Sequence, residues 1–340
     1  MNQEERDAIC LKLFNKKEKD VKYGMFTHYV HRQLTEGESC LRTGLYSWLP
    51  VMNGDVYQFQ EVDPETYKTF DIIHVNLSGQ DIQIPGTVKQ YLPKDSKTLI
   101  VANNDYTVEL WQGSFDYMPV VARELQYPDV LFGTEPYQVG ALECLTKRKV
   151  HQIVHPSFTK RLKSIASPKQ QPVISVVWHR YDNYSLAPSI AVKDLGLKTR
   201  LIGYDQNVDK GFFKTSVHYN QLVDGTNFMD FCTQLAESKV VVDPFTLTSQ
   251  GRVGWDCASL GVALVGSNRN YSHRVCYPKT SCDPFDIKEI RRLTKLLLTD
   301  EKFRKEVIDY AKNAVEYVSY ESSKDKFLKA LEEGSPQINI

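Results

Sequence analysis

The sequence lacks any hydrophobic run of about eighteen residues, the minimum for a membrane-spanning helix. It also lacks the basic and then apolar opening of a secretory signal, because it begins Met-Asn-Gln-Glu-Glu-Arg-Asp. Its seven cysteines are scattered and form no Cys-x-x-Cys pair, which argues against a disulfide framework and a cysteine-based metal site. We therefore expect a cytoplasmic protein with no membrane span.

The sequence has no excess of either charge, because 42 Lys and Arg residues balance 42 Asp and Glu residues. Overall charge therefore indicates neither nucleic acid nor acidic lipid as a partner. One local asymmetry exists: no acidic residue occurs between Glu143 and Asp182, although eight basic residues do. The candidates for binding a polyanion are the basic residues Lys147, Arg148, Lys149, Lys160, Arg161 and Lys163.

The length of 340 residues predicts more than one domain. We expect an N-terminal Rossmann-like domain over 1–155, a basic linker over 156–172, a C-terminal Rossmann-like domain over 173–320, and a C-terminal helix and tail over 321–340. Strands and helices alternate most clearly in the second domain, as in doubly wound α/β folds. The predicted fold is α/β, with two Rossmann-like domains that face each other across a cleft and a helical C-terminal tail.

The most informative stretch runs from Val240 to Ser267 and reads as a strand, a loop rich in hydroxyl groups and glycine, a helix and a second strand. The exposed N–H groups and the dipole of a helix N-terminus favour an anion. Ser249, Gly251 and Arg252 lie beside that N-terminus, so the pattern predicts a diphosphate site. Asp256, one helical turn after Arg252, either accepts hydrogen bonds from a ribose diol or forms an intrahelical salt bridge.

This stretch resembles the C-terminal half of glycosyltransferases of the GT-B type, whose members use nucleotide sugars. In the retaining, glycogen synthase-like branch, two glutamates separated by seven residues precede a stretch of small residues that ends Gly-Val-Pro-Val-Val. Here Asp256 takes the second acidic position and Gly261-Val-Ala-Leu-Val the ending, but Thr248 takes the first acidic position. The resemblance, which extends from Val173 to about Tyr320, therefore implies nucleotide binding and leaves the stereochemical outcome open.

The resemblance implies that a sugar is transferred from a nucleotide-diphosphate sugar, with UDP-sugar the first expectation, to a hydroxyl acceptor. Negative charge then builds on the leaving diphosphate, and Arg180, Ser249 and Arg252 could stabilise it together with the helix N-terminus. We expect no metal and no further cofactor, because the sequence has no Asp-x-Asp of the kind found in metal-dependent transferases of the other common fold.

An inverting reaction would need a base from the N-terminal domain. The candidates at the ends of predicted strands are His28, His74, Asp81 and Asp105. Asp105 is the first choice because Asn103-Asn-Asp-Tyr follows a clear buried strand, and His28 is the second.

The acceptor could be a glycan or a hydroxymethylated DNA base, since some members of the resembled class, including phage-encoded ones, glycosylate such bases. DNA would require phosphate contacts from the basic residues between Lys147 and Lys163, and a base flipped out of the duplex. A nucleic-acid-binding module without catalysis and a nucleotide-sugar epimerase also remain open. A nicotinamide oxidoreductase is disfavoured, because no Gly-x-Gly-x-x-Gly follows a predicted strand.

Overall fold

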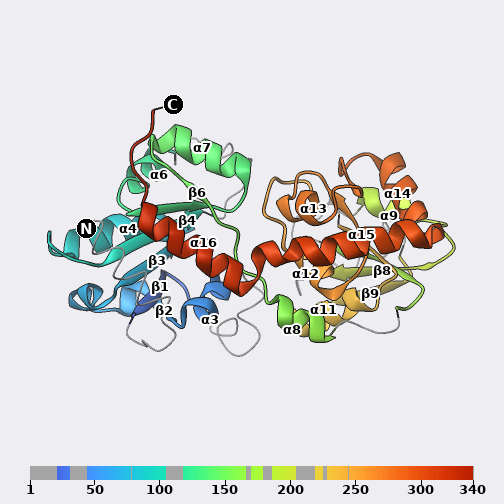
Figure 1. Ribbon diagram of the computed structural model, residues 1–340, viewed down its shortest axis with the longest axis horizontal. Helices are drawn as coiled ribbons and strands as arrows, with labels where there is room; N and C mark the ends of the chain where they lie inside the picture. Colours follow the sequence, from blue (N-terminus) through green and yellow to red (C-terminus); the bar gives the residue numbers. More distant parts are fainter. Residues whose placement is uncertain are drawn as a thin grey trace. The chain divides into compact units, whose positions relative to one another are not determined.

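The computed structural model describes residues 21–30, 44–77, 79–104, 118–165, 170–178, 186–203, 219–224, 228–243 and 245–339. The chain forms two compact units (Figure 1). Unit 1 contains the residues up to Pro156 and those from Tyr320 onward, and unit 2 is Ser157–Ser319. The chain therefore leaves unit 1, builds unit 2 without interruption, and returns to unit 1.

Unit 1 is built on a six-stranded parallel sheet with the strand order β2-β1-β3-β4-β5-β6. The strands are β1 (Tyr23–Thr27), β2 (Asp55–Gln58), β3 (Ile72–Asn76), β4 (Leu99–Asn104), β5 (Val130–Gly133) and β6 (His151–Gln152). The helices are η2 (Leu45–Ser47), α3 (Trp48–Met52), η3 (Phe59–Glu61), η4 (Pro64–Thr69), η5 (Gly79–Gln83), α4 (Ile84–Tyr91), α6 (Met118–Glu124), α7 (Pro136–Thr146) and α16 (Tyr320–Glu333). Four strands, β1, β3, β4 and β5, are buried along their whole length, as expected for a parallel sheet covered on both faces.

The C-terminal helix α16 belongs to the core of unit 1. Alternate residues of a strand point to opposite faces of a sheet, so the sheet has two separate apolar clusters. One of them contains Met25 of β1, Val101 of β4 and Phe132 of β5 together with Phe327 and Leu331 of α16. Phe327 is fully buried there, and Figure 1 draws α16 across the strands of this unit.

Unit 2 has a second six-stranded parallel sheet, with the strand order β12-β11-β10-β7-β8-β9. Its strands are β7 (Val173–Trp178), β8 (Lys198–Gly203), β9 (Gln221–Asp224), β10 (Val240–Asp243), β11 (Leu264–Ser267) and β12 (Ser281–Cys282). Its helices are α8 (Thr159–Ile165), α9 (Leu186–Val192), α11 (Phe228–Ala236), α12 (Arg252–Leu260), α13 (Tyr271–Cys276), α14 (Ile287–Thr299), α15 (Glu301–Ala314) and η7 (Val315–Val318).

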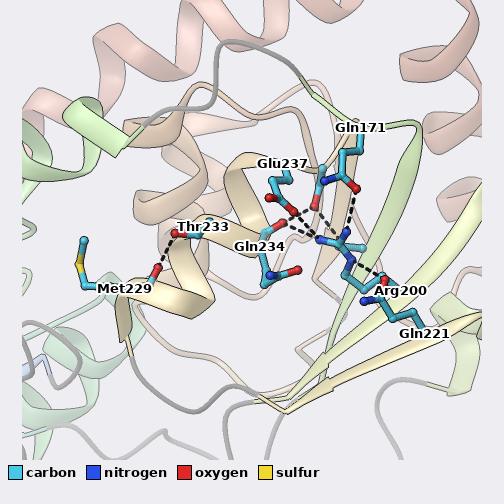
Figure 2. Close-up of polar contacts among 9 residues, drawn as sticks. Gln171, Arg200, Gln221, Met229, Thr233, Gln234 and Glu237 are labelled. Atoms are coloured by element: carbon cyan, nitrogen blue, oxygen red, sulfur yellow. Dashed lines mark hydrogen bonds and ion pairs between the residues drawn. The ribbon is translucent and has the colours of Figure 1, made fainter.

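A buried arginine holds several segments of unit 2 together. Arg200 of β8 is 3% exposed and donates hydrogen bonds to the side-chain oxygens of Gln171, Gln221 and Glu237 (Figure 2). It also donates to the backbone oxygen of Gln234. These bonds join the segment before β7, the strands β8 and β9, and the end of α11, so this cation stabilises the fold.

The predicted α/β fold with two Rossmann-like sheets and a helical C-terminal segment is confirmed. Part of the stretch predicted as a linker, 156–172, folds instead as α8, because Leu162 is fully buried in unit 2. Within the described ranges, no helix is both long and apolar enough to cross a membrane.

Candidate functional site

Each sheet changes the direction of its connections at one position, between β1 and β3 in unit 1 and between β7 and β10 in unit 2. At such a switch point, the loops after two neighbouring strands diverge, and ligands of open α/β sheets bind there. The strand ends at the switch points are Thr27 and Asn76 in unit 1, and Trp178 and Asp243 in unit 2. The helix that follows β10 is α12, so the topology places the predicted diphosphate site at a switch point.

The N-terminus of α12 has the features of an anion site. Its N-cap is Gly251, which has a φ of 64° and provides no side-chain cap. A Cβ at Gly251 would lie 2.8 Å from Cβ of Asn270, so the close approach of the chain there also requires glycine. The first turn of α12 has no acidic residue and begins with Arg252, although a helix N-terminus favours negative charge. An anion bound at this turn would stabilise both the N–H groups and the arginine.

Arg252 and Asp256 form a loose buried pair on α12. Nε of Arg252 lies 3.9 Å from Oδ1 of Asp256, and the guanidinium carbon lies 5.5 Å from the ring centre of Phe228. Within the described part of the chain, Nε and Nη2 of Arg252 and both carboxylate oxygens of Asp256 are buried without a hydrogen bond. Buried polar atoms normally have hydrogen-bond partners, and the Arg252 side chain keeps 14% exposure, so its guanidinium can still donate to an anion.

Burial has a clear effect on Asp256 itself. Asp256 has no exposed surface, and this burial raises the pKa of its carboxyl from the usual 3.8 to about 6, although Arg252 opposes the shift. The intrahelical pair of Asp256 with Arg252 is present. The carboxylate has no exposed surface at which a ribose diol could donate a hydrogen bond to it.

The loop before α12 is attached to the start of α13. Ser249 donates a hydrogen bond from its hydroxyl to Oδ1 of Asn270 at 2.7 Å, and its backbone oxygen accepts one from the N–H of Tyr271. The backbone oxygen of Gln250 accepts another from the N–H of Ser272. Ser249 is thus at the predicted place, and its partner Asn270 was not among the predicted site residues. Arg180 lies outside the described residues.

At the switch point of unit 1, His28 and Asp81 form a second polar pair. Nδ1 of His28 lies 3.1 Å from Oδ1 of Asp81, and the same oxygen accepts a hydrogen bond from the backbone N–H of His28 at 2.7 Å. The hydroxyl of Thr27 donates to the other carboxylate oxygen. Both side chains keep some exposure, 19% for His28 and 14% for Asp81. Since Nδ1 faces the carboxylate, Nε2 is the nitrogen available to a ligand.

The other two base candidates have different outcomes. Asp105 lies outside the described residues. His74 is fully buried in the sheet, where Nδ1 lies 2.5 Å from Oη of Tyr23 and Nε2 lies 2.8 Å from Oδ1 of Asn103. His74 was one of four candidate bases, but its alternating position on β3 directs its side chain into the core rather than past the end of the strand.

The basic residues of the predicted polyanion surface come from both units. Lys147, Arg148 and Lys149 belong to unit 1, whereas Lys160, Arg161 and Lys163 lie on α8 in unit 2. The first group precedes β6 and so lies near the amino end of that strand. His28 and Asp81 follow β1 and β3 and lie near the carboxyl ends of those strands, on the opposite side of the parallel sheet.

Several of these basic side chains also have structural partners. Arg148 is buried and donates to the backbone oxygens of Leu125, Gln126, Pro128 and Ser335. The prediction is wrong for this residue, because its guanidinium holds the C-terminal segment to unit 1. Lys149 forms an ion pair with Glu333, and Lys163 forms one with Glu316. Arg161 donates a hydrogen bond to the hydroxyl of Ser164. The backbone of Lys147 adopts a left-handed conformation as the C-cap of α7.

Known proteins similar to this chain were found by their structures and not by their sequences. No protein-family model matches the sequence, and no curated protein does. Similar structures include a sucrose-phosphate synthase from Thermosynechococcus elongatus, with a TM-score of 0.68 and 11% identity, covering 92% of this chain and 98% of the other. The chain has the GT-B fold.

Two further structures with this fold were solved with a nucleotide. A structure of trehalose-6-phosphate from E. coli bound with UDP-2-fluoro glucose has a TM-score of 0.65 and 9% identity, over 92% of this chain and 99% of that one. Anabaena HepE in complex with UDP has a TM-score of 0.67 and 10% identity, over 92% and 100%. In the described part of this chain, no group of three or more His, Cys, Asp or Glu residues is placed to hold a metal ion.

Proposed function

We propose that this protein is a glycosyltransferase that moves a sugar from a UDP-sugar to a hydroxyl acceptor. The observation that carries the proposal is the first turn of α12, which combines a glycine N-cap, a basic first residue and buried guanidinium nitrogens with no hydrogen bond among the described residues. Such groups bind phosphate oxygens. The similar fold of proteins solved with UDP and with a UDP-sugar analogue supports the choice of donor.

In the proposed reaction, the donor diphosphate binds the N–H groups at the start of α12 and the guanidinium of Arg252. As the bond between the sugar carbon and the phosphate oxygen breaks, that oxygen keeps the electron pair and the diphosphate gains negative charge. Groups placed to stabilise such charge contribute about 10² to 10³ each to the rate. We propose that Arg252 and the helix N-terminus do this without a metal ion, and Arg180 remains a predicted second cation.

We further propose that the reaction inverts the anomeric configuration and that His28 is the catalytic base. Asp81 beside Nδ1 keeps the proton on that nitrogen, which leaves Nε2 as the proton acceptor. The acceptor oxygen then bonds to the sugar carbon while its proton moves to Nε2, and the carboxylate of Asp81 stabilises the resulting imidazolium.

We propose a sugar hydroxyl, rather than a hydroxymethylated DNA base, as the acceptor. DNA was suggested by the basic stretch, but Lys147, Arg148 and Lys149 lie at the far edge of the sheet from His28. Arg148 is also buried, and Lys149 pairs with Glu333.

A thermal-shift measurement tests the donor site. UDP at about 100 times its Kd should add about 2.7 kcal/mol to the stability of the wild type and raise its Tm. Arg252→Ala should lose this shift, whereas Arg292→Ala, an exposed arginine paired with Glu289 on α14, should keep it. A wild-type Tm that responds to neither UDP nor UDP-glucose would contradict the proposal. Turnover of UDP-glucose without any acceptor would instead indicate an epimerase.

A further inference from the structure

A buried histidine joins the segments that build the proposed donor site. His273 of α13 has no exposed surface, and its Nε2 lies 3.1 Å from Oδ2 of Asp243, the last residue of β10. Its Nδ1 lies 3.2 Å from the backbone oxygen of Ser267, the last residue of β11. The imidazole therefore contacts the carboxyl ends of two neighbouring strands, one of which forms the switch point.

The same imidazole also contacts α12. A Cβ added to Gly254, the third residue of α12, would lie 2.7 Å from Cδ2 of His273 and 2.2 Å from the hydroxyl of Ser272. A Cβ added to Gly266 of β11 would lie 2.5 Å from Cγ of His273. Because Gly254 and Gly266 have no side chains, the imidazole of His273 packs directly against their backbones. The ring therefore sets the distance between the first turn of α12 and α13.

Oxygen atoms lie close to both ring nitrogens. Oδ2 of Asp243 lies 3.1 Å from Nε2, and the backbone oxygen of Ser267 lies 3.2 Å from Nδ1. The amide nitrogen Nδ2 of Asn270 lies 3.5 Å from Nδ1. These polar contacts hold the ring at the carboxyl ends of β10 and β11.

We propose that His273, paired with Asp243, is the positioning residue of the donor site. It would touch neither substrate, and it would act by holding the first turn of α12 where its N–H groups and Arg252 can bind the donor diphosphate. The inference rests on the proposed function and adds a residue to it. Because a displacement of about 1 Å in a binding group can cost about 10²-fold, loss of His273 should weaken donor binding by about tenfold or more.

Calorimetric titration of the full chain with UDP and UDP-glucose tests this proposal, because it yields two separate quantities. The stoichiometry reports the fraction of protein that is folded, and the Kd reports the geometry of the site in that fraction. His273→Ala should raise the Kd for both probes about tenfold or more while the stoichiometry stays near that of the wild type. His273→Gln, which can still donate one hydrogen bond, should recover part of the affinity. Lys279→Ala, an exposed residue shortly after α13 that pairs with Glu306, should leave the Kd unchanged.

Asp243→Asn provides an independent variant if His273→Ala does not fold. It should raise the Kd in the same way, and the double variant with His273→Gln should be no weaker than the worse single one, because both changes remove the same pair. An unchanged Kd in His273→Ala or Asp243→Asn, even with reduced stoichiometry, would overturn the proposal and leave His273 a purely structural residue. Absence of binding by the wild type to either probe would overturn the proposed function, which is a different and recognisable result.

Discussion

Replacing Arg148 with methionine should destabilise unit 1 strongly, although the sequence suggests a solvent-exposed basic patch at this position. The guanidinium donates to four backbone oxygens, one of them in Ser335, so the substitution leaves buried carbonyl groups without their donor. Hydrogen bonds to a charged group contribute about 1.5–3 kcal/mol each, but such bonds in one network are not additive. We expect a net loss of about 3–5 kcal/mol, because several buried carbonyl groups, each costing about 1–3 kcal/mol when unsatisfied, lose their donor at once.

The assay is urea unfolding of the full chain, followed by circular dichroism, with hydrogen exchange to locate the change. Exchange should accelerate in the C-terminal segment, where the N–H of Lys149 donates to Pro336 and the N–H of Ile338 donates to Lys147. Lys149→Met is the matched control, because this neighbouring lysine forms a surface ion pair worth about 1 kcal/mol or less. If Arg148→Met costs no more than Lys149→Met, the assignment of Arg148 as the residue that holds the C-terminal segment is refuted.

Three further predictions concern the two switch points. Because burial raises the pKa of Asp256 to about 6, the folded state binds its proton more tightly than the unfolded chain. The contribution of Asp256 to wild-type stability should be fully present below about pH 4 and fall by roughly 3 kcal/mol as the pH rises through 6. Asp256→Asn should therefore be more stable than the wild type at pH 7.5 and equal to it near pH 4 in urea unfolding, and a constant difference would contradict the pKa shift. Gly254→Ala would place a methyl group 2.2 Å from the hydroxyl of Ser272, so it should cost about 1–3 kcal/mol in Tm measurements and weaken UDP binding, whereas Gly140→Ala, with open space around it, should not. His28→Gln should lower the transfer rate about 10² to 10⁴-fold with unchanged UDP affinity, and an equal loss of UDP affinity would argue that His28 is not the base.

The sequence predicted the fold well because the fold depends on local patterns. Short apolar strands followed by helices indicate parallel sheets, and the stretch from Val240 to Ser267 carries its turn, its N-cap glycine and its basic first residue within a few positions. The predicted Ser249, Gly251 and Arg252 are indeed together at the start of α12. The nucleotide-binding roles of these residues stay predictions, and Arg180 and Asp105 lie outside the described residues.

The sequence could not predict the contacts that depend on packing. Asp243 and His273 are in contact because α13 packs at the carboxyl ends of the strands, where β10 ends at Asp243. Their separation of 30 residues in the sequence does not indicate this contact. His28 and Asp81 come from different strand ends and are 53 positions apart. Arg148 looked like part of a basic surface, because charge can be read from a sequence but the burial of one side chain among carbonyl groups cannot.

The return of the chain to unit 1 constrains the order in which the protein can form during synthesis. Phe327 and Leu331 fill the core between strands made much earlier, so the N-terminal sheet cannot complete its apolar interior until α16 has left the ribosome. Unit 2 is continuous in sequence, from Ser157 to Ser319, and has no such requirement. The half of the molecule that is translated first should therefore mature last, and its incomplete apolar surface would need protection from aggregation while the rest is made.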